Sequence, residues 1–65
     1  MRTFHYTKDD EFCIFVEKRG GAWFEICGRG HTPNDAGRYL GAAEADKEFE
    51  RLVADGFKRR SVKGD

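Results

Sequence analysis

The sequence predicts an α+β domain in which a three-stranded antiparallel sheet is followed by one C-terminal helix, in the order β-β-β-α. Residues 2–28 contain three short segments rich in aromatic and β-branched side chains, as strands do. Turn-forming residues at 8–10 and 20–21 separate these segments. Residues 39–53 instead repeat apolar side chains every three or four positions, which is typical of an amphipathic helix.

The composition is that of one small folded domain, residues 1–65. The chain of 65 residues carries six Phe, two Tyr and one Trp, and its 12 basic and 12 acidic residues balance. A disordered chain would have fewer aromatic residues and a larger net charge. No apolar run approaches the length of a membrane span, and the N-terminus lacks the apolar stretch of a secretory signal. We therefore expect a cytoplasmic protein with no membrane partner.

The three expected strands cover residues 2–7, 11–19 and 22–28. Gly20 and Gly21 supply the positive φ angles of a two-residue hairpin loop. That loop sets a register in which Ile14 faces Cys27 and Cys13 faces Gly28.

This register divides the strand residues between two faces of the sheet. One face holds Phe4, Tyr6, Cys13, Phe15, Phe24 and Ile26, and the other holds His5, Phe12, Ile14, Val16, Trp23, Glu25 and Cys27. We expect Phe15 to lie between sheet and helix. Both faces are rich in apolar side chains, which is unusual for a sheet with one solvated side.

The expected helix begins at Thr32-Pro33-Asn34-Asp35, which combines a hydroxyl N-cap, a proline in the first turn and an early carboxylate. Gly37 and Gly41 are unfavourable inside a helix, so it is either continuous or broken near Gly41, with a second part that begins near Ala42. It ends at Asp55-Gly56. Phe57 then packs back onto the core, and residues 58–65 form either a short strand or a frayed basic tail.

Four residues of metal-ligand type occur: His5, Cys13, Cys27 and His31. Their spacing matches no common zinc motif, and the register places the two cysteines on opposite faces. That placement also disfavours an intramolecular disulfide. We therefore expect two reduced, buried cysteines, two surface histidines, and a non-enzymatic protein with no catalytic residue, metal or cofactor.

The second half of the chain resembles part of the double-stranded RNA-binding domain. Gly28-Arg29-Gly30, Ala36, Ala42-Ala43 and the segment 49–52 match the passage from sheet through glycine-bearing loop to helix in that family. The resemblance covers roughly residues 12–53. It implies a nucleic-acid-binding module, although the family has lysines at the helix start where this chain has Pro33, Asn34 and Asp35.

One helix can bury only one side of the sheet, so we expect another structure to bury the second apolar side. We predict a protein partner or a self-dimer, with Ile14, Val16 and Trp23 in the contact. An acidic helix surface with Glu44, Asp46 and Glu48 is a second candidate contact. The alternative is that the tail and residues 29–41 fold over this side.

The function predicted from the sequence is that of a small protein-binding regulator or inhibitor, of the kind that phages and mobile elements encode. The alternative is a nucleic-acid-binding module similar to double-stranded RNA-binding or sheet-type DNA-binding domains. Its candidate contacts are Arg29, Lys58, Arg59 and Arg60. Zero net charge makes nucleic acid the less favoured partner.

Overall fold

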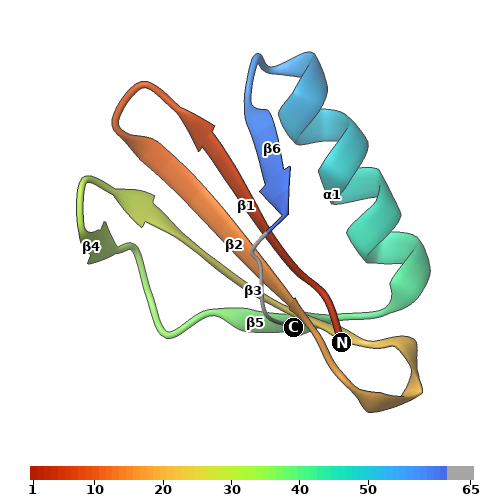
Figure 1. Cartoon of the computed structure of the whole chain (residues 1–65). Coiled ribbons are helices and arrows are strands. Elements are labelled where there is room, and N and C mark those ends of the chain that lie inside the picture. The colour runs from red at the N-terminus through yellow and green to blue at the C-terminus, as the bar shows by residue number, and fades with distance from the viewer. Residues whose placement is uncertain (62–65) are drawn as a thin grey trace.

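The computed structural model describes residues 1–61 and has an antiparallel sheet with one helix on one of its faces (Figure 1). The elements are β1 (Thr3–Lys8), β2 (Glu11–Glu17), the 3-10 turn η1 (Arg19–Gly21), β3 (Trp23–Arg29), β4 (Thr32–Pro33), β5 (Arg38–Leu40), α1 (Ala42–Ala54) and β6 (Lys58–Ser61). The strand order is β4-β3-β2-β1-β6, and β5 also pairs with β3. The α+β class, the antiparallel sheet and the C-terminal helix are confirmed, but the sheet has six strands instead of three.

The hairpin between β2 and β3 differs from the predicted one by a single residue. The loop contains Arg19, Gly20 and Gly21, and the Lys18 N–H donates a 2.8 Å hydrogen bond to the Ala22 carbonyl across it. Three loop residues in place of two shift the register by one, so Cys13 now faces Cys27. Both loop glycines have positive φ, as expected.

This shift moves every residue of β3 to the other side of the sheet, because side chains alternate along a strand. Trp23, Glu25 and Cys27 share a face with Phe4 and Phe15. Phe24 and Ile26 share the opposite face with Phe12, Ile14 and Val16 of β2. The expected faces of β1 and β2 are right, and those of β3 are reversed.

The segment after β3 forms no helix, contrary to the prediction from Thr32-Pro33-Asn34-Asp35. Thr32 and Pro33 pair with the end of β3 as an edge strand, where a proline is tolerated. The Asp35 carboxylate accepts a 2.8 Å hydrogen bond from the Gly37 N–H, which closes a local turn. Gly37 has a φ of +89°, and a Cβ there would lie 2.5 Å from the Phe24 ring. The residues that were expected to cap a helix therefore form the edge strand β4 and the turn that leads to β5.

Helix α1 begins at Ala42, the start expected for a helix broken near Gly41. The Glu44 carboxylate accepts a 3.2 Å hydrogen bond from the Gly41 N–H. At the other end, Gly56 has a φ of +100°, and the Phe57 N–H donates a 2.9 Å bond to the Leu52 carbonyl. This cap turns the chain back, so that Phe57 packs against the core as predicted and β6 pairs with β1.

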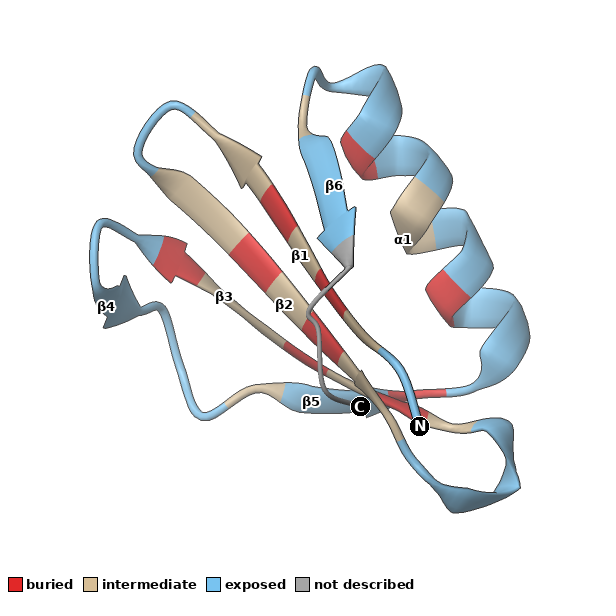
Figure 2. Ribbon diagram, viewed as in Figure 1, coloured by how far each residue is buried: buried red, intermediate tan, exposed pale blue. Residues whose placement is uncertain are grey.

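The hydrophobic core lies between α1 and the face of the sheet that the helix covers, called the helix face below. Buried and half-buried residues alternate along β1 and β2, and the buried residues of α1 are on its sheet side (Figure 2). The core residues are Phe4, Tyr6, Cys13, Phe15, Trp23, Leu40, Ala45 and Leu52. The Phe49 ring stands at a steep angle to Phe15 and Trp23, at centroid distances of 4.8 and 5.3 Å.

Candidate functional site

The side of the sheet away from α1 is called the open face. Its strand positions are Thr3, His5, Thr7, Phe12, Ile14, Val16, Phe24, Ile26, Gly28, Pro33, Tyr39, Lys58 and Arg60. The apolar side chains of β2 and β3 on this face are half-buried by one another, and Tyr39 is 69% exposed. Within residues 1–61, residues 30–41 run along the edge of β3, where Gly37 lies against the Phe24 ring and Gly30 and His31 border Phe12 and Ile14, and β6 extends the sheet beyond β1. The rest of the open face has no helix over it within this part of the chain.

The charges of the strands are divided unequally between the two faces. Lys58 and Arg60 lie on the open face, opposite Thr7 and His5 of β1. The strand carboxylates Glu11, Glu17 and Glu25 all lie on the helix face. Within the described strands, the open face therefore carries cations and no carboxylate.

Ile14 and Val16 lie on the open face, where the sequence placed them, and both are half-buried. Trp23 does not, and its expected place in a contact surface is wrong. It is 4% exposed and stacks on Phe4 beneath the helix, with ring centroids 5.3 Å apart. The one-residue register shift is the reason. Phe24, Ile26 and Tyr39 take its place on the open face.

The three acidic helix residues do not form one exposed surface. Glu44 binds the start of its own helix, and Asp46 is exposed. The Glu48 side chain is only 19% exposed because it turns toward the sheet, where it pairs with Arg51 at 2.7 Å and with Arg38 at 3.6 Å. The three residues of the predicted acidic surface therefore have different roles: Glu44 caps the helix, Asp46 faces solvent, and Glu48 forms ion pairs with arginines.

The four basic candidates are also separated. The Arg29 guanidinium lies 3.4 Å from Asp10 and 4.0 Å from Glu11, at one end of the sheet. Lys58 and Arg60 are on the open face, whereas Arg59 is on the helix face, 4.5 Å from the centre of the Phe4 ring. The described part of the basic tail, residues 58–61, is a strand, and residues 62–65 lie outside the described residues.

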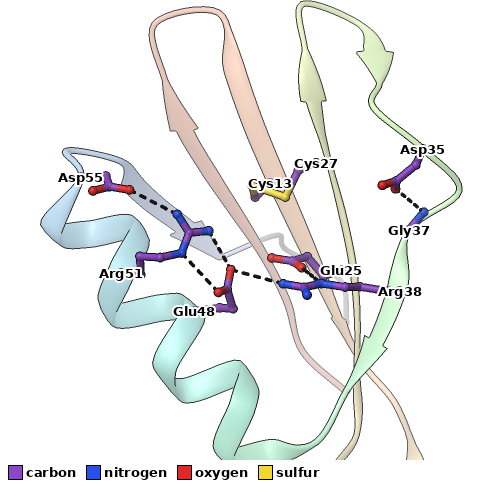
Figure 3. Close-up of a disulfide and its surroundings, with 9 residues drawn as sticks. All are labelled: Cys13, Glu25, Cys27, Asp35, Gly37, Arg38, Glu48, Arg51 and Asp55. Carbon is purple, nitrogen blue, oxygen red and sulfur yellow. Dashed lines mark hydrogen bonds and ion pairs between the residues drawn. A yellow bond between two sulfur atoms is a disulfide. The ribbon is translucent and has the colours of Figure 1, made fainter.

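A chain of ion pairs joins β3, β5 and α1 on the helix face (Figure 3). Glu25 is 5% exposed, and its Oε1 accepts a 2.6 Å hydrogen bond from Arg38 Nε. Arg38 reaches Glu48, which pairs with Arg51, and Arg51 pairs with Asp55 at 3.2 Å. Hydrogen bonding by the Arg51 guanidinium lowers the pKa of Glu48 below its ordinary value. Hydrogen bonding to Glu25 raises the pKa of Arg38.

A disulfide joins Cys13 and Cys27 beside this chain of ion pairs (Figure 3). The two residues face each other across β2 and β3, with Cα atoms 4.0 Å apart. The expectation of two reduced cysteines on opposite faces is therefore wrong, again because of the hairpin register. The two sulfur atoms and a carboxylate oxygen of Glu25 lie within 4.8 Å of one another. Sequence spacing gave no indication of this cluster, because a loop of three residues was needed to form it.

His5 and His31 lie near each other on the open side, where they border a hollow of about 220 Å³ together with Phe12, Ile14 and Gly30. His31 is exposed in a turn, and His5 is half-buried with its ring centroid 6.5 Å from that of Phe12. The two histidines and the cysteines are on opposite sides of the sheet, so they do not form one site.

Comparison with known proteins assigns no family. No family model matches the chain, and neither a curated protein nor a solved structure has significant similarity to it. No helix formed by residues 1–61 is long and apolar enough to cross a membrane. The fold and the site define a small α+β domain whose antiparallel sheet has one face under a helix and a second face with half-buried apolar side chains and no helix among the described residues.

Proposed function

We propose that this chain is a protein-binding module that contacts its partner through the open face. The observation that carries the proposal is the group of apolar side chains Ile14, Val16, Phe24 and Ile26, which share the face without a helix and are each only half-buried by the described residues. A sheet with one solvated side normally alternates apolar and polar residues. A contiguous apolar area on a small domain marks an interaction surface instead.

The charges of the open face indicate the chemistry of the partner. Lys58 and Arg60 lie on the same face at the β6 edge, separated from the apolar group by His5 and Thr7 of β1, and the described strands place no carboxylate there. The complementary surface is apolar at its centre and acidic at its rim. A second copy of this chain fits less well, because it presents the same cations on the same face. By covering such a surface on another protein, the domain would act as a regulator or inhibitor.

Crosslinking and matched variants test this proposal. A photo-crosslinking residue in place of Phe24 captures the partner in its native cells, and binding is then measured with both proteins purified. We expect Ile14→Asp to weaken binding by about 100-fold, since it places a carboxylate in the apolar centre and opposite an acidic rim. Val53→Asp, the same kind of change at a 58% exposed position of α1, is the control and should bind normally.

Two results would contradict the proposal. The first is a folded Ile14→Asp variant, checked by circular dichroism, that binds the purified partner as well as the parent does. The second comes from sedimentation velocity. A parent protein that is dimeric, with an Ile14→Asp variant that is monomeric, would make a second copy the occupant of the open face.

A nucleic-acid-binding module is the second candidate function, and one arrangement favours it. Lys58 and Arg60 lie on the same face as His5 and Phe12, so cations stand next to rings on which bases stack. A gel shift with single-stranded and duplex RNA tests this. If binding occurs, falls steeply with salt and is lost in the double variant Lys58→Gln/Arg60→Gln, nucleic acid replaces protein as the partner. Arg59→Gln, on the opposite face, is the matched control.

A further inference from the structure

The disulfide between Cys13 and Cys27 has an unusual neighbour. Glu25 lies two residues before Cys27 on the same face of β3 and is 5% exposed. Its Oε1 is bound by Arg38, but its Oε2 is buried and has no hydrogen-bond partner among residues 1–61. A buried carboxylate oxygen without a donor is unfavourable, so this atom calls for an explanation.

Reduction of the disulfide supplies the missing donor. A disulfide sulfur has no proton to donate, whereas a cysteine thiol has an S–H group. Both sulfur atoms lie within 4.8 Å of a Glu25 carboxylate oxygen, so a reduced thiol on either cysteine is close enough to reach this carboxylate after a change of side-chain rotamer. The carboxylate therefore gains a hydrogen bond only in the dithiol form, and it favours that form over the disulfide.

We propose that Cys13 and Cys27 form a thiol–disulfide exchange site, in which the disulfide accepts electrons from a dithiol reductant and Glu25 stabilises the reduced pair. This activity stands apart from binding at the open face, since the cysteines lie on the helix face. Arg38 holds the carboxylate in place through its 2.6 Å bond to Oε1 and leaves Oε2 available to a new donor, with the disulfide next to it (Figure 3).

The exchange proceeds in two displacements. A thiolate of the reductant attacks the sulfur of Cys27, which is partly buried, whereas Cys13 is 6% exposed. The bond between the cysteines breaks, and Cys13 leaves with the electron pair and takes a proton released by the reductant. The second thiol of the reductant attacks the mixed disulfide, forms the reductant's own disulfide and releases Cys27, which is protonated in the same way. Two electrons and two protons pass to the protein.

Equilibration of the purified protein with reduced and oxidised glutathione tests the proposal. The fraction of thiol is measured by alkylation and mass spectrometry, with circular dichroism to confirm that the protein stays folded. We expect the folded protein to be reduced, and Glu25→Gln to shift the equilibrium constant about tenfold toward the disulfide, because Arg38 binds the amide oxygen and the remaining NH2 group cannot accept a hydrogen bond from a thiol. Glu17→Gln, on the same face but paired with Arg2, is the control and should leave the constant unchanged.

Two outcomes would overturn the inference. A disulfide that is reduced only after denaturant unfolds the protein would be structural. An equilibrium constant that is the same in the parent and in folded Glu25→Gln would remove the role of Glu25. If Glu25→Gln does not fold, infrared spectroscopy of the reduced parent decides: a thiol bound to Oε2 shifts its S–H stretching band to lower frequency, and an unshifted band contradicts the assignment.

Discussion

The two faces of the sheet are built from the same strands but differ in packing and in charge. The helix face holds Phe15 and Trp23 beneath α1, together with the disulfide and every carboxylate of the described strands. The open face holds half-buried aliphatic and aromatic side chains with two cations at one edge. Because adjacent residues of one strand belong to different faces, neighbouring substitutions can separate stability from binding.

The largest effect that would test this comparison is expected for Phe15. Its side chain is fully buried between sheet and helix, so Phe15→Ala should lower the free energy of unfolding by about 5 kcal/mol. Phe12→Ala, on the same strand but on the open face, should cost about 1 kcal/mol. Urea denaturation followed by circular dichroism measures both. Equal costs would mean that the two faces are packed alike.

Trp23 and Phe24 make a second pair, adjacent on β3 and on opposite faces. Trp23→Ser removes a buried ring from the core and should lower the free energy of unfolding by about 3–4 kcal/mol. Phe24→Ser should cost less and should weaken partner binding, which Trp23→Ser leaves unchanged in its folded fraction. Thermal unfolding and binding of the purified partner measure the two effects. A folded Trp23→Ser variant that has lost binding would contradict this placement and would support the register of a two-residue loop, in which Trp23 lies on the open face.

The smallest effect concerns the ion pairs of the helix face. The Arg51 guanidinium lowers the pKa of Glu48, so the ionised carboxylate stabilises the fold above the ordinary pKa of about 4.5. This stabilisation is lost as the pH falls through the lower pKa of the folded state. Glu48→Gln should therefore make the free energy of unfolding less dependent on pH below about 4.5, by a few tenths of a kcal/mol.

Urea unfolding between neutral pH and pH 3 measures this difference, with Glu50→Gln, on the exposed side of α1, as the control. A Glu48→Gln variant that loses stability with acid as steeply as the parent does would mean that the pair with Arg51 does not persist in solution.

Much of the open face follows from the sequence. The alternation along residues 2–7 and 11–17 assigns Phe15 to the core and Ile14 and Val16 to the other side, and both assignments agree with the structure. Both faces of the predicted sheet are apolar and the chain has one predicted helix, so the sequence also predicts that one apolar face has no helix over it. The predicted length of the loop at Gly20 and Gly21 was wrong, because the same dipeptide is compatible with a loop of two residues or of three.

The sequence by itself determined the location of the first three strands and the helix end at Asp55-Gly56, and Ala42 was the helix start only in the alternative of a break near Gly41. These features are local, since alternation, spacing and caps depend on neighbouring residues alone. The tertiary structure decided which side of β3 faces the helix, and with it the burial of Trp23, the disulfide and the free oxygen of Glu25. It also decided that Thr32–Pro33 and Arg38–Leu40 pair with β3 as edge strands. Such choices depend on contacts between distant segments, where a shift of one residue reverses a whole strand.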